Sequence, residues 1–521
     1  MNPLNPFPIE QYAALLPIAA LVVAGLAALL ADVFIPREAK IVLSQITVAG
    51  VVLAAVAAFI LWTGPKDHVI LGGSIAISRL GFMLSLGILA AGGAAGLYSA
   101  HYAEGTTVAT GEYYGLILFA LAGMLGLVVS NDLATLFVSI ETLSICVYSL
   151  TGIMRRARSA EAAMKYFVLG AFSSGFLLYG IALIYGAAGT LQLDVIAAKG
   201  FQQGGALAAG GIALLLVGLL FKVGAVPFHA WIPDAYEGAP ASVTGFMSVA
   251  VKAAAFGAAL RVLTAFGHNG IPAVTSPLSL YWVLWVIAAI TMILGNAGAF
   301  TQSNPRRLLA YSGIAHTGYA LCGLVTIAHW ADSGRTSGPD LDSAAHDAAA
   351  GVLYYLVGYG VANLCAFSVL CYLERGGEDV DDIAHLAGLS RTKPFAAFAM
   401  TIAMISLAGV PLTSGFIAKL WVFKAAVAGG DTGLVVLGLM TSALSLGYYL
   451  RVVVVMYMRT PGEPIPEEPS PLPRTAPLGG ESTRWGPRLA LALMATATIW
   501  LGILPGKLLD YATTGALALF S

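Results

Sequence analysis

Residues Leu219–Pro240 read LLFKVGAVPFHAWIPDAYEGAP and follow an apolar run that begins near residue 205. Lys222 stands inside this run, five residues before Pro227. A charge near a bilayer centre costs on the order of 2.5–3.5 kcal/mol on insertion scales, so a lysine placed there indicates a functional site. Proline interrupts a helix, and we expect the Val223 carbonyl to lose its helical partner beside Lys222. The stretch therefore predicts a broken membrane helix that binds and releases protons or cations.

The composition of the whole chain is that of a polytopic membrane protein. Its 521 residues are 58% hydrophobic and only 10% charged, whereas soluble domains carry roughly 25% charged residues. The formal net charge is −1, so no basic surface indicates nucleic acid as a partner. The cysteines form no CxxC pair and indicate neither a metal site nor a redox motif: Cys146, Cys322, Cys365 and Cys371.

Apolar runs of about 20 residues recur along the chain and predict an all-α protein with about fourteen membrane helices. The first run is long enough to span a membrane and lacks the basic segment of a cleavable signal peptide. The expected spans are 12–34, 41–63, 80–100, 113–130, 132–153, 163–187, 205–226, 241–263, 280–300, 308–329, 348–373, 394–426, 433–458 and 488–506. An even number of spans places both termini on the same side.

Lysine and arginine residues concentrate in one alternate set of loops, and the most basic of these is Arg155–Arg158. Cytoplasmic loops carry the excess of positive charge, so this loop is expected in the cytoplasm and both termini in the periplasm. Two other loops fall on the same side. We expect a short amphipathic turn in the acidic loop 374–393 and irregular structure in the Pro-rich loop 459–487.

Three more ionisable residues lie inside apolar runs, namely Glu141, Lys252 and Lys419. Glu141 shares one helix face with Ser144 and Tyr148, which follow it by three and seven residues. Together with Lys222, these residues suggest a route for protons or cations across the membrane. The structural alternatives are a neutral, hydrogen-bonded carboxyl group and lysines that snorkel to a helix end or pair for packing.

Two patterns strengthen the functional interpretation of the lysines. Lys252 continues a polar stripe of Thr244 and Ser248 at four-residue spacing on an otherwise apolar helix. Lys419 follows a second proline, Pro411, in the stretch SLAGVPLTSGFIAKLWVF. Interrupted helices in corresponding positions of two halves indicate internal repeats around a transport site, and these two lie five spans apart.

Candidate relay residues occupy the tenth and eleventh spans. His316 shares a face with Ser312, and either a satisfied histidine of the bundle or a proton carrier fits this pattern. Tyr355 and Tyr359 are also candidates, although packing is the favoured interpretation for both. Three titratable residues after the seventh span are interpreted as solvated loop residues rather than as proton-feeding groups: His229, Asp234 and Glu237.

Five separated stretches resemble the antiporter-like subunits of respiratory complex I, a family that includes subunits L, M and N and the Mrp-type cation/proton antiporters. They are SIETLSICVYSL, MKYFVLGAFSSGFLLYG, FKVGAVPFHAWIPDAYEGAP, RRLLAYSGIAHTGYAL and LAGVPLTSGFIAKLWVF. The KYFVLGAFSSG segment is similar to subunit N, the counterpart of mitochondrial NADH dehydrogenase subunit 2. The chain lacks the long lateral helix of subunit L, and lysine at position 419 argues against subunit M.

The resemblance implies a fourteen-helix bundle with two inverted five-helix repeats. It also implies that Glu141 pairs with Lys222, that Lys252 is central, and that Lys419 gates the exit. The implied regions are three N-terminal helices (1–112), a first repeat (113–263), a second repeat (280–458), the Pro-rich loop (459–487) and a last helix with the C-terminus (488–521).

The function implied by this resemblance is proton translocation by a membrane-arm subunit of an NADH–quinone oxidoreductase in a bacterial inner membrane. No nucleotide or cluster motif occurs in the chain, so flavin, iron–sulfur clusters and quinone are expected in partner subunits. The expected partners are the other membrane-arm subunits and lipids. Two alternatives stay open, an Mrp-type sodium/proton antiporter subunit and a purely structural membrane-arm subunit.

Overall fold

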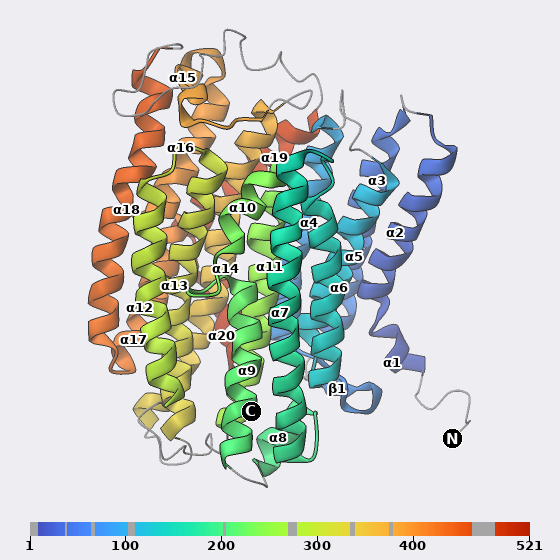
Figure 1. The fold of residues 1–521 in the computed structure, drawn as a ribbon, viewed down its shortest axis with the longest axis vertical. Helices are drawn as coiled ribbons and strands as arrows, with labels where there is room; N and C mark the ends of the chain where they lie inside the picture. Colours follow the sequence, from blue (N-terminus) through green and yellow to red (C-terminus); the bar gives the residue numbers. More distant parts are fainter. Residues whose placement is uncertain are drawn as a thin grey trace.

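The computed structural model describes residues 9–36, 39–63, 68–102, 110–201, 205–268, 279–333, 339–374, 379–460 and 485–520. These residues form a bundle of long helices that run mostly along one direction (Figure 1). The described part of the chain therefore confirms a predominantly α-helical, polytopic membrane protein.

The N-terminal part comprises α1 (Ile9–Ala13), α2 (Leu16–Phe34), α3 (Ile41–Trp62), β1 (His68–Ile70), the 3₁₀ helix η2 (Leu71–Gly73), β2 (Ile75–Ile77) and α4 (Arg79–Tyr102). The middle part comprises α5 (Gly111–Val129), α6 (Leu133–Thr151), α7 (Ala157–Ala188), α8 (Leu193–Lys199), α9 (Gly205–Val223), α10 (Trp231–Gly238) and α11 (Ala241–Gly267). The last part comprises α12 (Leu280–Phe300), α13 (Pro305–Ser333), α14 (Pro339–Leu373), η4 (Ile383–Leu386), α15 (Leu389–Thr392), α16 (Pro394–Ala408), α17 (Ser414–Ala428), α18 (Thr432–Met458), α19 (Trp485–Ile503) and α20 (Gly506–Leu517).

Twelve of the described helices are long and apolar enough to cross a membrane, namely α2 to α7, α9, α11 to α14 and α18. The expected span 394–426 consists instead of α16 and α17, which have 15 residues each. The expected last span corresponds to α19, which meets α20 at an angle of 80°. The number of helices that can span the membrane singly is therefore twelve, or thirteen with the bent pair, because a break divides one expected span.

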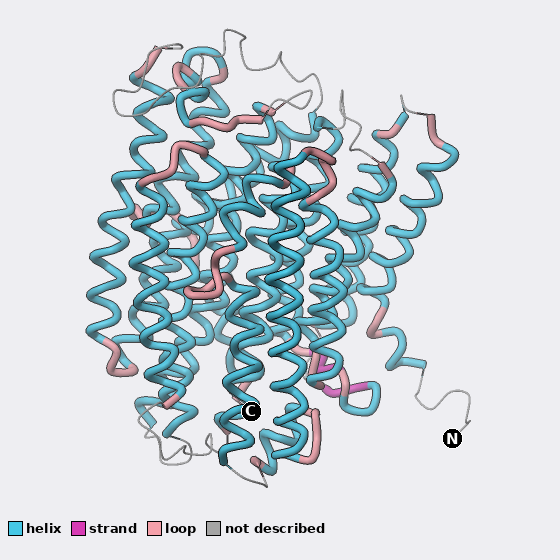
Figure 2. The backbone as a smooth tube through the Cα atoms, viewed as in Figure 1, coloured by secondary structure: helices cyan, strands magenta, loops and turns pink. Residues whose placement is uncertain are grey.

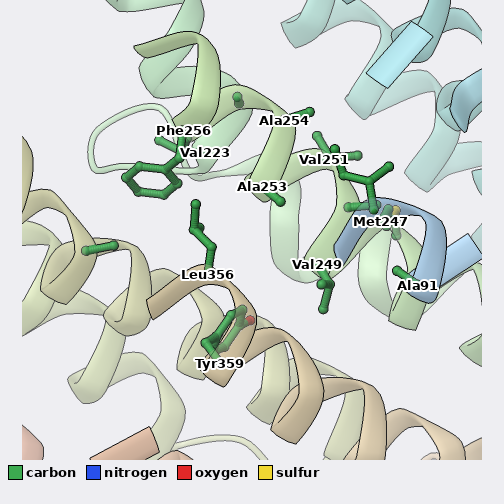
Figure 3. Packing of buried hydrophobic residues seen from close by; sticks show 14 of the residues in the cluster. Ala91, Val223, Met247, Val249, Val251, Ala253, Ala254, Phe256, Leu356 and Tyr359 are labelled. Atoms are coloured by element: carbon green, nitrogen blue, oxygen red, sulfur yellow. The ribbon is translucent and has the colours of Figure 1, made fainter. Parts of the chain in front are cut away.

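The helices differ strongly in how much of their surface is covered. We compare the 18-residue apolar segment of each helix. In α11 and α13, 94% of this segment is buried, whereas the buried share is 33% in α7 and 22% in α2. Figure 3 shows side chains of α11 and α14 packed in this core, among them Val249, Phe256 and Tyr359. Polar side chains on the central helices are therefore largely surrounded by protein, where a buried polar group is costly unless it is hydrogen-bonded.

Two helices are interrupted near the middle of the bundle. Figure 1 shows α9 and α10 one above the other, and α16 and α17 in the same relation. The segment between α9 and α10 appears in Figure 2 as a loop about half-way along the length of the bundle. The two prolines expected to break helices, Pro227 and Pro411, both lie in these interruptions.

A small β-hairpin is the one β-sheet in the described part of the chain. Strands β1 and β2 pair antiparallel with His68 opposite Ile77. An isolated bridge between Ile75 and Ser130 ties this hairpin to the end of α5 (Figure 2). The sequence analysis predicted helices alone and missed the hairpin, because two three-residue strands give almost no periodic signal.

The acidic loop 374–393 carries the predicted short turn. It forms η4 and α15, and the apolar side chains of Ile383, Leu386 and Leu389 are all buried. Most of the Pro-rich loop 459–487 lies outside the described residues.

Candidate proton-transfer site

Helix α9 ends at a glycine and not at the proline. Gly224 is left-handed, with φ 77°, and the amides of Gly224 and Ala225 both donate to the Leu220 carbonyl at 3.0 Å. Glycine adopts this conformation without a steric penalty, so it closes the helix before Pro227 is reached. Proline 227 then keeps the chain from resuming the helix at once.

The Val223 carbonyl has no helical partner, as expected, because residue 227 is proline. Val223 O accepts a hydrogen bond of 2.8 Å from Thr317 Oγ1 on α13. On the other side of the break, Val226 N donates to Thr291 Oγ1 on α12 at 3.0 Å. Two threonines from the second half of the chain thus satisfy the broken backbone of the first half, as buried polar groups require.

Lys222 is 2% exposed and points at hydroxyl groups of α6. Its Nζ donates to Ser144 Oγ at 2.7 Å and to Tyr148 Oη at 3.1 Å. The Tyr148 ring centroid lies 5.2 Å from the same nitrogen, within the range of a cation–π contact. The face predicted from the spacing of Ser144 and Tyr148 is therefore the face that meets Lys222.

Glu141, the third member of that face, does not form an ion pair with Lys222 among the described residues. It is half-buried, and its Oε1 accepts a hydrogen bond from Ser174 on α7. Glu141 stands one helical turn before Ser144, so it is close enough to influence the charge of Lys222 through space.

Lys252 lies at the centre of the bundle and is 4% exposed. Its Nζ donates to the Gly313 carbonyl of α13, and the Tyr359 ring centroid is 5.5 Å away. One turn earlier on α11, Ser248 accepts a hydrogen bond of 2.6 Å from Asn363 Nδ2. The predicted polar stripe thus meets polar groups of α13 and α14.

The first member of the stripe, Thr244, has a different role. Its Oγ1 donates to the carbonyls of Tyr236 and Pro240 at 3.0 and 3.1 Å. These bonds close the junction between α10 and α11. Thr244 therefore holds the end of a helix and does not contact Lys252.

His316 joins three helices through tyrosine hydroxyls. Its Nδ1 lies 2.6 Å from Tyr355 Oη on α14, and its Nε2 lies 3.2 Å from Tyr449 Oη on α18. Tyr449 Oη is also 2.5 Å from Ser312 Oγ. Tyr449 was not predicted, although it follows Ser442 by seven residues and so shares its face of α18.

Lys419 binds the end of the second interrupted helix and is 6% exposed. Its Nζ donates to the carbonyls of Leu407 and Ala408 at 3.1 and 3.0 Å, and to Ser442 Oγ at 2.7 Å. The last carbonyls of a helix carry partial negative charge, so they favour an ammonium group at this position.

Two of the three titratable residues after α9, Asp234 and Glu237, are not simple solvated loop residues, which corrects that interpretation for them. Asp234 lies 2.9 Å from Lys165 and 2.7 Å from Arg307, and Glu237 is 2.7 Å from the same arginine. The two carboxylates are 31% and 18% exposed. They tie α10 to α7 and to the start of α13.

The sequence matches the family model described as NADH:quinone oxidoreductase/Mrp antiporter, TM over residues 130–336 and 341–445. A relative named NADH-quinone oxidoreductase subunit N, from Myxococcus xanthus, is 40% identical over 96% of this chain and 97% of its own length. The chain belongs to this family. A second subunit N, from Trichlorobacter lovleyi, is also 40% identical and covers 96% of this chain and 95% of its own. The resemblance drawn from five stretches is confirmed.

Two solved structures have a fold similar to that of this chain. A chain of respiratory complex I from Thermus thermophilus with bound aureothin has 32% identity and a TM-score of 0.74, covering 96% of this chain and 100% of that chain. A chain of the Mrp complex from a Dietzia species has a TM-score of 0.80 at 23% identity, covering 98% of both chains. The second likeness concerns the fold alone.

The described residues contain no group of three or more His, Cys, Asp or Glu side chains that could hold a metal ion. The four cysteines are buried and are not in disulfides. The titratable groups of the site are its lysines, its carboxylates, His316 and the tyrosine hydroxyls.

Proposed function

We propose that this chain moves protons through the membrane arm of an NADH–quinone oxidoreductase by way of Glu141, Lys222, Lys252 and Lys419. The observation that carries the proposal is the placement of the three lysines, each at least nine-tenths buried and each bonded to acceptors from another helix. Such groups are expensive to bury, and their burial in a core is explained if their charge changes during function.

Two sets of hydrogen bonds support the order of the relay. Thr317 Oγ1 donates to Val223 O beside Lys222 and lies 3.1 Å from Gly313 O, the acceptor of Lys252. From the same stretch of α13, His316 leads through Tyr449 to α18, where Ser442 binds Lys419. Imidazole and hydroxyl groups both donate and accept protons, so they suit a relay.

Electrostatics supplies the driving principle. A carboxylate near Lys222 favours the charged ammonium, and moving Glu141 away favours release of the proton toward Lys252. Each charge that crosses the membrane requires about 2.3 kcal/mol per 100 mV of membrane potential. This energy must come from redox reactions in other subunits, where we place flavin, iron–sulfur clusters and quinone.

The wider architecture belongs to the same proposal. We place two inverted repeats at 113–263 and 280–458, with the α9–α10 and α16–α17 breaks in corresponding positions. Counting α16–α17 and α19 as one span each gives fourteen spans, with both termini in the periplasm of a bacterium. The similarity of the two breaks supports this arrangement.

The test uses inverted membrane vesicles that contain the complete complex with Lys222→Ala or Lys252→Ala. We expect the complex to assemble, as seen on a native gel, while inhibitor-sensitive NADH–quinone turnover and proton uptake fall together. Normal uptake in both assembled variants would refute the relay.

The same variants separate the alternatives. A purely structural subunit predicts that the variants fail to assemble. An Mrp-type antiporter predicts sodium-dependent proton movement without NADH, in line with the fold shared with the Mrp chain. Subunit N relatives at 40% identity favour the oxidoreductase.

A further inference from the structure

A buried pair, Arg306 and Glu374, lies at the end of the bundle that carries the Arg155–Arg158 loop. Arg306, at the start of α13, is 1% exposed, and Glu374, directly after α14, is 0% exposed. Their closest approach is 3.9 Å, from Arg306 Nε to Glu374 Oε1. This distance is too long for a hydrogen bond, so the pair is held only by its charges.

Arg306 gives its stronger contacts to other groups. Its Nη1 donates to the Ala239 carbonyl at 2.9 Å, and its Nη2 lies 3.1 Å from Asp381 and 3.3 Å from Asp379. Three carboxylates therefore share the charge of one buried arginine. Glu374 is the most distant of the three and the most deeply buried.

The other two carboxylates each have a second arginine. Asp379 pairs with Arg156 at 2.8 Å, and Asp381 lies 3.5 Å from Arg158. Glu374 lacks such a second cation among the described residues. A buried carboxylate with so little compensation is the member of the cluster that neutralises by binding a proton.

The hydrogen bonds of Glu374 leave a position for that proton. Oε1 accepts only a long bond of 3.4 Å from Val380 N, and Oε2 is buried without a partner in the described part of the chain. Arg306 Nε is likewise buried without a hydrogen-bond partner. Burial raises the pKa of the Glu374 carboxyl to about 7, with Arg306 opposing the shift and Asp379 and Asp381 adding to it.

Helix geometry connects Glu374 with Lys252. Glu374 continues α14 through a bond from its amide to the Leu370 carbonyl, and it shares a face with Asn363, eleven residues earlier. The helical rise separates the two by about 16 Å. Arg306 shares a face of α13 with Gly313, which binds Lys252. Phe367, whose ring contacts Tyr236, lies between Glu374 and Asn363 in the sequence of α14.

We propose that Glu374 is the proton-loading residue of this chain, binding a proton from the aqueous side at Oε2 and supplying it toward Lys252 along the interface of α11, α13 and α14. This inference deepens the proposed function and rests on it. The charge bias predicts that the loading side is the cytoplasm. The step is a proton transfer alone: Glu374 loses its negative charge on loading and regains it on release.

The direct test is infrared difference spectroscopy of the purified complex, comparing the wild type with Glu374→Gln over a pH series. We expect the variant to lose one protonated-carboxyl band, which in the wild type disappears with a midpoint near the pKa of about 7. In vesicles, wild-type proton uptake should decline above that pH, because the protonated fraction falls about tenfold for each further pH unit. Glu374→Gln should pump slowly at every pH.

Asp379→Asn is the matched control, because it removes a carboxylate from the same arginine and leaves Glu374 in place. The Asp379→Asn variant should keep the infrared band, and the pH midpoint of the band should fall. The reason is that the negative charge of Asp379 no longer disfavours the charged form of Glu374, while the positive charge of Arg306 still favours it. If the complex with Glu374→Gln does not assemble, Glu374→Asp is used in its place. This variant keeps a titrating carboxyl group and should keep a protonated-carboxyl band.

An unchanged infrared spectrum in Glu374→Gln would overturn the proposal, and so would wild-type proton uptake in that variant while Lys222→Ala and Lys252→Ala fail to pump. Normal pumping in the two lysine variants is a different result. It would refute the relay of the proposed function even if Glu374 titrates as expected.

Discussion

The two interrupted helices are broken by the same backbone arrangement, but the lysine near each break binds different groups. Each first helix ends at a left-handed glycine, Gly224 with φ 77° and Gly409 with φ 86°, and a proline follows within three residues. Lys222 stands before its break and binds side chains of α6, whereas Lys419 stands after its break and binds two backbone carbonyls.

This difference has a consequence for function. Two of the three acceptors of Lys419 are backbone carbonyls, which no side-chain substitution removes directly, and the third is the Ser442 hydroxyl. The acceptors of Lys222 are a serine and a tyrosine, which move with α6 and with Glu141. We infer that the hydrogen bonds of Lys222 change more readily than those of Lys419 when a neighbouring helix moves. A lysine that responds to a conformational change needs this property.

The largest expected effect is that of removing both side-chain acceptors of Lys222 in a Ser144→Ala/Tyr148→Phe double variant. A hydrogen bond to a charged group is worth about 1.5–3 kcal/mol. The rate of proton uptake should therefore fall by a factor of about ten or more. The loss should approach that of Lys222→Ala in the same vesicle assay.

Ser149→Ala is the control for the double variant, because Ser149 is exposed on α6 and its hydroxyl bonds only the Ile145 carbonyl of its own helix. Wild-type uptake in the double variant would show that Lys222 does not depend on these hydroxyls. The contrast with Lys419 would then fail.

An intermediate effect is expected for Thr317→Val, which leaves the Val223 carbonyl of the first break without its partner. A buried carbonyl left unsatisfied costs about 1–3 kcal/mol, so the purified complex should dissociate at a lower temperature. Thr326→Val on the same helix is the control, since Thr326 donates to Cys322 O of its own helix. Equal melting of the two variants would argue against the role of Thr317 in sealing the break.

The smallest effect is expected for Ser442→Ala. Lys419 loses one acceptor but retains the Leu407 and Ala408 carbonyls, so the cost should be smaller than in the Ser144→Ala/Tyr148→Phe variant, where Lys222 loses both side-chain acceptors. Proton uptake should stay within several-fold of the wild type. A loss as large as that of the Ser144→Ala/Tyr148→Phe variant would mean that the carbonyls do not hold Lys419.

The candidate residues of the relay were recognised from local patterns. Glu141, Lys222, Lys252 and Lys419 were visible because an ionisable residue in an apolar run is rare and costly. The polar face of α6 followed from spacing alone, because residues three, four and seven apart lie on one side of a helix.

Other features depended on which helix faces meet. The partner of Glu141 is Ser174 and not Lys222, and the Val223 carbonyl binds Thr317, 94 residues further along the chain. Spacing within one helix carries no information on such contacts. For the same reason the Arg306–Glu374 pair was missed, since the two residues start and end different helices.

The sequence by itself determined the membrane class, the family, the positions of the buried charges and the places where two helices break. These properties are set locally, by hydropathy, by helical periodicity and by glycine and proline. Only the tertiary structure decided which acceptors each lysine receives and which carboxylates gather around Arg306. The physical reason is that a buried polar group must be satisfied by whatever the packed helices bring within about 3 Å of it.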